Sequence, residues 1–143
     1  RSEQARARRV TAAQGLAGRI AGVREARVIE DVLLAVQVEA GANGRAGVET
    51  LVQDPIFAGL KLIAAVSPDV PLDDPTLVLW GIFTRFDAAR DVVFSEVSVH
   101  GAWPTARGRM GIDATWKAGY PEPVGMPEEI VRRVDARWGE LWR

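Results

Sequence analysis

Residues 73–94, DDPTLVLWGIFTRFDAARDVVF, decide how this chain folds. Asp73 or Asp74 can accept a backbone N–H as a helix N-cap, and Pro75 follows with its φ already set and no N–H to leave unpaired. A helix therefore begins here. Over its next two turns it has no polar face, which is typical of a helix buried on all sides, and its apolar residues are Leu77, Val78, Leu79, Trp80, Ile82 and Phe83.

Two strands flank this helix in the sequence. The helix ends near Phe86, a charged turn spans 87–91, and the β-branched and aromatic run at 92–94 favours an interior strand. Residues 60–66, LKLIAAV, have the same character on the other side of the helix. Strand, buried helix and strand together predict an α/β layer, with a right-handed crossover between the two strands.

The rest of the chain extends this pattern in both directions. Hydrophobic spacing and turn residues predict a helix over 4–20 that Gly22 ends, strands at 27–29 and 32–38, a helix over 45–53, a loop over 95–108, a strand or turn over 108–116, and a last helix that begins at Pro127. We expect this last helix to bury one apolar stripe, made of Ile130, Val134, Trp138 and Leu141.

The order of these elements predicts an α/β fold with a single domain. We expect a three-layer sandwich with a mainly parallel sheet of about four to five strands and flanking helices. The 143 residues and the apolar content of 48% suit one domain with its own core. Residues 1–27 hold seven arginines, which we interpret as a solvated helix face. We therefore divide the chain into a basic N-terminal helix or linker at 1–22 and an α/β domain at 23–143.

Composition excludes several classes of function. The chain has no cysteine, which removes disulfides, thiolate metal sites and a cysteine nucleophile, and its single histidine, His100, argues against a histidine metal site. The net charge of −1 argues against a nucleic-acid partner. No apolar run reaches the roughly 18–20 residues that span a bilayer, and no signal-peptide core is present, so we expect a cytoplasmic protein without membrane contact.

No motif for autonomous catalysis is visible. The glycine pairs at 41–44 and 108–111 lack the spacing of a phosphate-binding loop. Ser95 and Ser98 would have to share His100 within a few residues of one segment, whereas an activated nucleophile needs its base held on a separate element. We therefore assign no catalytic residue and no metal ligand to this chain.

Two clusters of charge have both a functional and a structural interpretation. Arg107, Arg109 and Lys117 can cover an anionic ligand while Asp113 orients an arginine, or Asp113 can simply cap a turn, and the residues alone favour neither. Arg85 can clamp a carboxylate or phosphate through its planar fork. We favour its structural interpretation, a cation at the C-terminus of a helix.

The five tryptophans divide by their surroundings. Trp80 and Trp138 lie on apolar helix faces, and we assign them to the core. Trp103 and Trp116 lie in predicted coil, where exposed indoles mark a partner or ligand surface. We assign these two, together with Trp142, to an interface with a partner.

Several motifs resemble one family of enzymes. Leu79-Trp80 and the segment 84–94, TRFDAARDVVF, are followed by 109–115, RMGIDAT, and by 134–138, VDARW. In this order and spacing they resemble the C-terminal domain of the UbiD-type decarboxylases, over about residue 23 to the end. Arg109 stands where that family commonly has lysine, so a planar fork replaces a point charge.

The resemblance implies a chain that acts with others. In that family a prenylated FMN, with a divalent metal and K⁺, lies on another domain of a longer chain, so we expect these groups on a larger UbiD-like catalytic subunit in a hetero-oligomer. By the resemblance, residues 109–115 form a loop near the substrate, which adds Met110 and Thr115 to the candidate site residues. The implied function is to complete a carboxylase or decarboxylase of aromatic or α,β-unsaturated acids, inactive as this chain alone. The alternative is a non-catalytic structural or regulatory binding module with the same fold.

Overall fold

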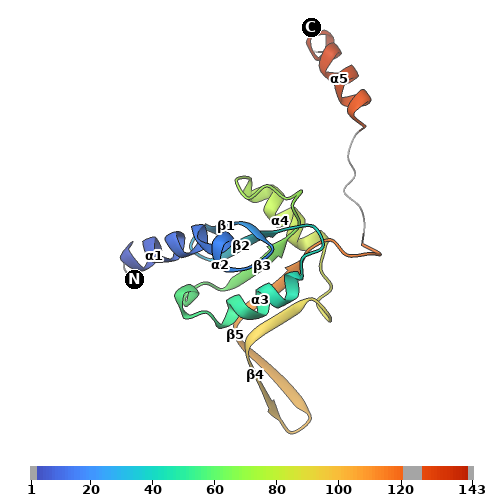
Figure 1. The fold of residues 1–143 in the computed structure, drawn as a ribbon. Coiled ribbons are helices and arrows are strands. Elements are labelled where there is room, and N and C mark those ends of the chain that lie inside the picture. The colour runs from blue at the N-terminus through green and yellow to red at the C-terminus, as the bar shows by residue number, and fades with distance from the viewer. Residues whose placement is uncertain (1–2, 121–126, 142–143) are drawn as a thin grey trace.

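The computed structural model describes residues 3–120 and 127–141, which form a three-layer α/β arrangement (Figure 1). In chain order the elements are α1 Glu3–Gln14, α2 Leu16–Arg19, β1 Val23–Ile29, β2 Leu33–Val38, α3 Gly44–Gln53, the short 3₁₀ helix η1 Pro55–Phe57, β3 Leu62–Val66, α4 Pro75–Thr84, β4 Val92–His100, β5 Trp103–Ala114 and α5 Glu128–Leu141. The predicted α/β class with a single domain is confirmed. Across these residues, no helix combines the length and apolarity needed to cross a membrane.

The sheet has five strands in the order β1-β2-β3-β5-β4. Its middle is parallel, because β3 pairs in parallel with both β2 and β5. Its two outer pairs, β1 with β2 and β4 with β5, are antiparallel. The strand number falls within the predicted four to five, and the sheet is mixed, with parallel pairing only among β2, β3 and β5. These three strands therefore end at the same edge of the sheet.

The predicted loop over 95–108 is wrong, because these residues form a β-hairpin. β4 continues to His100, the chain turns at Gly101, whose φ is +65°, and β5 returns antiparallel from Trp103. Val97 and Val99 alternate with polar neighbours, a strand pattern that Pro104 and Gly108 disguised in the sequence. The predicted parallel crossover from 60–66 to 92–94 is wrong for the same reason: β5 lies between β3 and β4, and β4 runs antiparallel to it.

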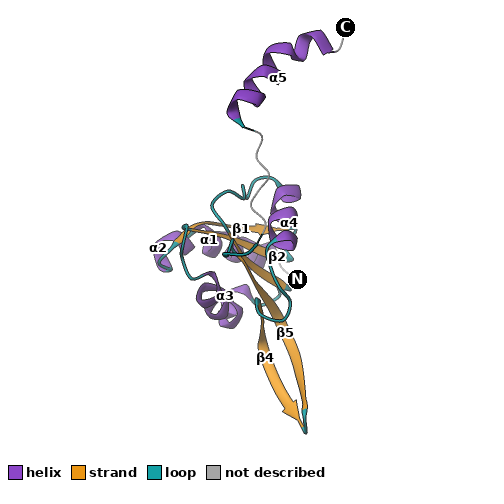
Figure 2. Ribbon diagram, turned by 90° about the vertical axis from the view of Figure 1, so that its right-hand side faces the viewer, coloured by secondary structure: helices purple, strands orange, loops and turns teal. Residues whose placement is uncertain are grey.

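Two clusters of buried side chains hold the layers together. On one face of the sheet, α1, α2 and α3 cover Leu34, Val36 and Ile63. On the other face, α4 covers Ala64 and Ile112. Figure 2 shows the sheet between α3 and α4. The N-terminal helices share the first cluster through Ala13 and Leu16, and the boundary at residue 22 stays a prediction.

Helix α4 begins as predicted but is not buried on all sides. The Asp74 carboxylate accepts the N–H groups of Thr76 and Leu77, and Pro75 takes the first helical position. Only Val78, Gly81 and Ile82 are buried. The other apolar side chains, and with them the predicted core residue Trp80, are exposed: Leu77 by 42%, Leu79 by 50%, Trp80 by 44% and Phe83 by 61%. These side chains are exposed because α4 lies alone in its layer. Only one face of the helix packs against the sheet, and the other faces are left to solvent.

Helix α5 also differs from its prediction. Ile130 and Val134 are exposed in its stripe, and Trp138 is exposed by 56%, so this stripe and Trp138 are not part of the core. The helix stands apart from the sheet (Figure 1), and the side chain of Leu141 lies outside the described residues. Its amphipathic pattern is real, but none of the described layers covers it.

Candidate functional site

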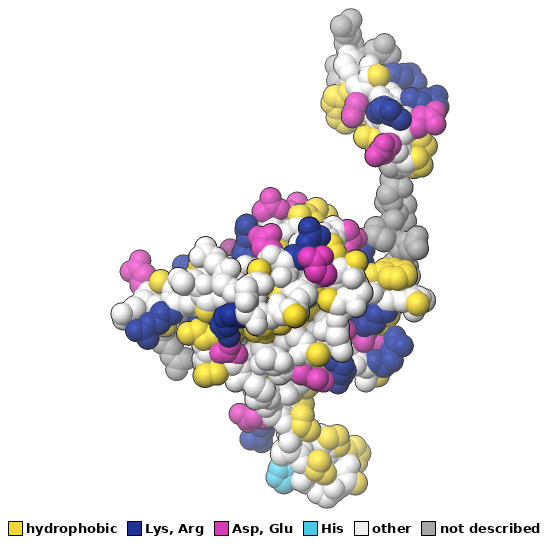
Figure 3. All heavy atoms as spheres, in the orientation of Figure 1, with side chains coloured by type: hydrophobic (Ala, Val, Ile, Leu, Met, Phe, Trp, Pro, Cys, Tyr) yellow, Lys and Arg dark blue, Asp and Glu magenta, His cyan; other side chains and the backbone are white. Residues whose placement is uncertain are grey.

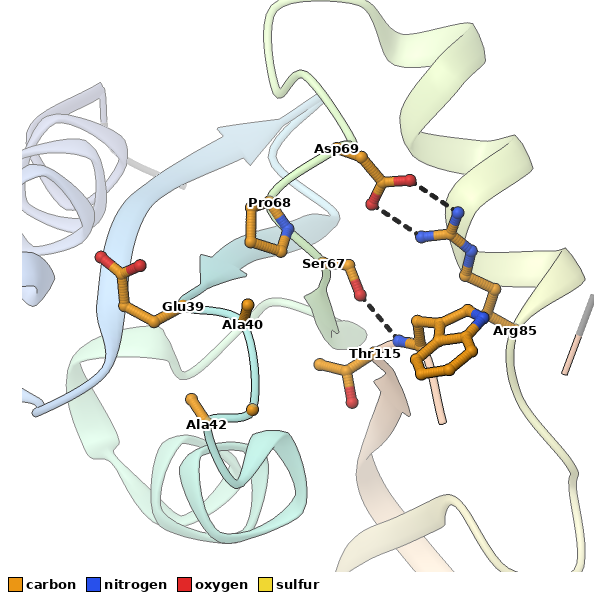
Figure 4. Close-up of a pocket in the computed structure, with 10 residues that line it drawn as sticks. Glu39, Ala40, Ala42, Ser67, Pro68, Asp69, Arg85 and Thr115 are labelled. Carbon is orange, nitrogen blue, oxygen red and sulfur yellow. Dashed lines mark hydrogen bonds and ion pairs between the residues drawn. The ribbon is translucent and has the colours of Figure 1, made fainter. Parts of the chain in front are cut away.

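A pocket of about 400 Å³ opens at the edge where β2, β3 and β5 end (Figure 4). Residues that directly follow each of the three strands line it, since Glu39 follows β2, Ser67 follows β3 and Thr115 follows β5. The carboxyl ends of parallel strands are where α/β folds bind ligands. The remaining lining residues are Ala40, Gly41, Ala42, Pro68, Asp69, Arg85 and Trp116.

One wall of the pocket is an ion pair between Arg85 and Asp69. Arg85 is the C-cap of α4, and its side chain is only 1% exposed. Its Nη1 and Nη2 donate to the two carboxylate oxygens of Asp69 at 2.8 and 2.7 Å, drawn as dashed lines in Figure 4. The guanidinium also lies 5.2 Å from the ring centroid of Trp80. Its fork is therefore filled from within the chain, which agrees with the structural interpretation of Arg85.

This ion pair changes the titration of Asp69. The hydrogen bonds from Arg85 lower the pKa of the Asp69 carboxyl below its ordinary value, against the opposing effect of burial. The Asp69 carboxyl of the folded chain is therefore charged near neutral pH. The pocket rim carries a second carboxylate, Glu39, and Arg85 is the one cation in its lining.

The base of the pocket is held by short-range hydrogen bonds. The hydroxyl of Ser67 accepts the N–H of Trp116 at 2.7 Å. Buried Asp113 accepts both the hydroxyl and the N–H of Thr115, at 2.6 and 3.1 Å. A Cβ atom at Gly44, the first residue of α3, would lie 2.5 Å from Asp113 Oδ1. Only glycine at this position lets the start of the helix come so close to the carboxylate. The hydrogen bond that it donates to Asp113 thus fixes the direction of the Thr115 hydroxyl.

Arg90, Asp91, Lys117 and Tyr120 form a cluster next to Asp113 and Thr115. Lys117 Nζ donates to the carbonyls of Asp113 and Thr115 at 2.8 and 3.0 Å and lies 3.5 Å from Asp113 Oδ1. The Tyr120 hydroxyl donates to Asp91 at 2.7 Å and accepts from Arg90 at 2.8 Å. The cluster thus fixes the chain that leaves β5.

The pKa values within this cluster move in the directions that its contacts require. Burial raises the pKa of Asp91, but hydrogen bonds from Tyr120 and the Asp87 N–H, with the charge of Lys117, outweigh it, and the pKa falls below its ordinary value. The Asp91 carboxylate in turn raises the pKa of the Tyr120 hydroxyl. Neither group is left as a free acid or base near neutral pH.

The predicted site residues lie at different places along one strand. The strand or turn predicted over 108–116 is a strand up to Ala114, the end of β5, whereas the resemblance had implied a loop over 109–115. Thr115 lines the pocket, and Asp113 does not line it but accepts the hydrogen bonds of Thr115. Arg107 and Arg109 lie toward the turn of the hairpin. Arg107 is eight residues from Thr115, a separation of roughly 26 Å at about 3.3 Å of rise per residue. Arg109 Nε donates to the carbonyl of Val52 near the end of α3 at 2.8 Å, a contact that anchors a helix.

The other candidates are similarly dispersed. Met110 packs beside the α4-side core. Trp116 lines the pocket and is 43% exposed, whereas Trp103 lies near the hairpin turn and is 77% exposed. Trp142 lies outside the described residues. Among the residues that the structure describes, no group of three or more His, Cys, Asp or Glu side chains could hold a metal ion.

Sequence reasoning missed Glu39, Ser67 and Asp69. None of them belongs to a motif, and Asp69 meets Arg85 only because β3 and α4 pack together. A usable signal was present, since each residue follows a predicted strand, and parallel strands that end at one edge gather such residues. That signal needs the strand order, which the sequence does not reveal.

Comparison with known proteins places this fold among carboxy-lyases. Residues 24–114 match the sequence model of the 3-octaprenyl-4-hydroxybenzoate carboxy-lyase C-terminal domain. An uncharacterized protein of Archaeoglobus fulgidus is 40% identical over 94 residues, which are 57% of this chain and 20% of that protein. The chain therefore spans about a fifth of the length of this relative.

Two solved structures share the fold at low sequence identity. The vanillic acid decarboxylase of Sedimentibacter hydroxybenzoicus in its closed form has a TM-score of 0.64 at 17% identity, over 92% of this chain and 31% of that chain. The UbiD-class enzyme HmfF of Pelotomaculum thermopropionicum, in complex with FMN, has a TM-score of 0.57 at 21% identity, over 92% of this chain and 33% of that chain. At these identities the likeness concerns the fold.

Proposed function

The chain belongs to the family of 3-octaprenyl-4-hydroxybenzoate carboxy-lyase C-terminal domains, and on this premise we propose that it is the C-terminal part or small subunit of a UbiD-type carboxy-lyase. In this proposal it acts with a larger catalytic region on aromatic or α,β-unsaturated carboxylic acids. That region holds the prenylated FMN, its divalent metal and K⁺, and supplies every reacting group. This chain completes the enclosure of the active site and the assembly interface, and it is inactive alone.

The state of the pocket's polar groups carries this proposal. Arg85 is bound by Asp69, the Thr115 hydroxyl by Asp113, and the Ser67 hydroxyl by the Trp116 N–H. No buried side-chain polar atom of the described residues lacks a hydrogen-bond partner. A group that attacks or transfers a proton needs a free acid, base or nucleophile. The remaining carboxylate of the lining, Glu39, is 61% exposed at the rim and lies 3.8 Å from Arg24 Nε, so the pocket suits shaping and closing a site better than performing its chemistry.

The pocket does not suit the phosphate of a flavin. Its single lining cation, Arg85, is engaged with the carboxylate of Asp69, and Glu39 places one further negative charge at the rim. A phosphate placed there would find no unpaired lining cation and would be repelled by the Glu39 carboxylate. This supports placing the prenylated FMN on the partner, and the relative HmfF has been solved in complex with prFMN.

The exposed face of α4 is the surface that we assign to the catalytic region. Leu77, Leu79, Trp80 and Phe83 are 42–61% exposed and form an apolar patch on one helix, and such patches mark interaction sites. Phe83 and Phe86 pack edge to face at 6.0 Å between ring centroids, which preorganises the patch. Because the matched structures are about three times as long as this chain, a large region of such a protein remains to cover this face.

Co-purification tests the proposal directly. The full chain, tagged and co-expressed with a flavin-bearing UbiD-type catalytic region from the same genome, is expected to elute with it and with a flavin absorbance spectrum. The catalytic region with the tag alone is the control for non-specific capture. A chain that elutes without the flavoprotein, or a bound protein without flavin absorbance, would contradict the assignment and favour a non-catalytic binding module.

A further inference from the structure

One peptide group at the pocket is held on both of its sides. The peptide group between Thr115 and Trp116 is trans, so its C=O and its N–H point in opposite directions. Lys117 Nζ donates to its carbonyl oxygen at 3.0 Å, and its N–H donates to the Ser67 hydroxyl at 2.7 Å, drawn as a dashed line in Figure 4. These two contacts, which we call the Lys117–Ser67 clamp, fix the plane of the peptide group.

This peptide group determines where one wall of the pocket lies. Thr115 and Trp116 both line the pocket, and the peptide group between them carries the Cα of Trp116. The directions open to a side chain depend on the backbone at its own Cα. Trp116 is 43% exposed, so a turn of the peptide plane would move its indole relative to the rest of the lining.

The ammonium of Lys117 is itself held in place. It also donates to the carbonyl of Asp113 at 2.8 Å, and it lies 3.5 Å from Asp113 Oδ1 and 3.7 Å from Asp91 Oδ1. Both carboxylates are only 8% exposed. An ammonium has three N–H donors and no acceptor, so the two carbonyl oxygens and these carboxylates together occupy it.

Cations elsewhere on the surface are less constrained. On the face drawn in Figure 3, Lys and Arg side chains lie scattered among Asp and Glu. Arg45, for example, is 45% exposed and pairs with Glu49, which is 51% exposed. Exposed pairs of this kind contribute little to stability. Lys117 contacts two buried carboxylates instead, so its position is specified much more closely.

We propose that Lys117 and Ser67 are positioning residues, which hold the Thr115–Trp116 peptide group and, through it, the Trp116 side of the pocket wall. This inference rests on the proposed function, in which the pocket helps to enclose the active site of the assembled enzyme. Since the reacting groups lie on the catalytic region, a wall in the right place stabilises the bound acid and its transition state alike. Loss of either residue should therefore raise KM and leave kcat unchanged.

Amide exchange of the full chain tests the clamp without a partner. Lys117→Met removes the ammonium and keeps the length of the side chain. We expect it to speed the exchange of the Trp116 N–H, measured by NMR, about tenfold more than that of the Ile63 N–H in the central strand β3. Lys61→Met, the same substitution at the exposed lysine that precedes β3, should leave both rates unchanged. Equal acceleration at Trp116 and Ile63 would overturn the proposal, because it would show a general loss of stability.

Steady-state kinetics of the assembled enzyme test the consequence. The catalytic region is saturated with this chain, and the substrate is the aromatic acid that the assembly decarboxylates fastest. Lys117→Met and Ser67→Ala should each raise KM by about fivefold or more, with kcat within about twofold of the wild type. Ser67→Ala leaves the buried charges in place, so it tests the proposal even where Lys117→Met does not fold. The double variant should raise KM by less than the product of the two separate factors, because both side chains act on one peptide group.

Three kinetic results would overturn the proposal: an unchanged KM, a fall in kcat alone, or KM factors that multiply in the double variant. A chain that does not assemble with the catalytic region would contradict the proposed function instead. The exchange rates need only the chain, so they would still decide whether Lys117 fixes the peptide group.

Discussion

Replacing Asp69 with alanine is expected to destabilise the domain by about 3 kcal/mol, the lower end of the cost of breaking a buried ion pair from one side. The variant leaves Arg85, only 1% exposed, as a buried cation without its carboxylate. The lower end applies because Asp69 itself is 44% exposed, so water can reach part of the site. Urea unfolding followed by circular dichroism measures this change.

A matched variant isolates burial as the cause. Glu49 forms an exposed ion pair with Arg45 on α3 at 2.9 Å, so Glu49→Gln should change the stability by no more than about 0.5 kcal/mol. Equal effects of the two variants would show that the Asp69–Arg85 pair does not support the fold beyond an ordinary surface contact.

The pH dependence of the same pair has a defined sign. The pKa of Asp69 is lower in the folded chain than its ordinary value of 3.8, so the folded state binds protons less readily than the unfolded state. The stabilisation is complete above pH 3.8 and is lost as the pH falls through the lowered folded value. The difference in stability between the wild-type chain and Asp69→Ala should therefore shrink below about pH 4.

Replacing Phe83 with lysine is expected to weaken binding to the flavin-bearing partner at least 30-fold, which corresponds to the loss of an interface hot spot of about 2 kcal/mol. Phe83 is the most exposed side chain of the apolar face, at 61%. A lysine there would place a charge in the desolvated centre of the interface. Because the side chain is already exposed in the isolated chain, folding should be unaffected. Titration calorimetry with the purified partner measures the affinity.

The control for Phe83→Lys is Thr50→Lys, which adds the same charge to an exposed position of α3 on the opposite face of the sheet. This variant should bind the partner as the wild type does. Undiminished binding by Phe83→Lys would remove α4 from the interface, and an equal loss with Thr50→Lys would show a general effect of charge.

Much of the fold could be predicted because its signals are local. The Asp74 cap, Pro75 and the strand at 62–66 stand in the sequence next to the elements they define. The exposure of Phe83 could not be predicted from composition. A helix whose apolar side chains pack against a second protein has the same composition as a helix that is buried inside its own chain. The hairpin was missed because Pro104 and Gly108 are common loop residues, whereas here Gly108 has a φ of +81° and packs against Ser95.

The site was predictable only in part, because it depends on strand order. Thr115 was identified and lines the pocket, and Asp113 was identified and hydrogen-bonds it, but Arg107 and Arg109 share only their strand with these two. Arg85 was expected as a cation at the C-terminus of its helix, and it is the C-cap of α4, but its partner Asp69, which follows β3, was not foreseen. Such partners become visible only when the layers are assembled.

Turnover by the purified chain tests the central claim most directly. Release of CO₂ from a panel of aromatic and α,β-unsaturated carboxylic acids should be undetectable with the 143-residue chain alone, with or without added prenylated FMN. Adding the chain to the flavin-bearing catalytic region should raise turnover above that of the catalytic region by itself. Decarboxylation by the chain alone, at a rate proportional to its concentration, would contradict the account.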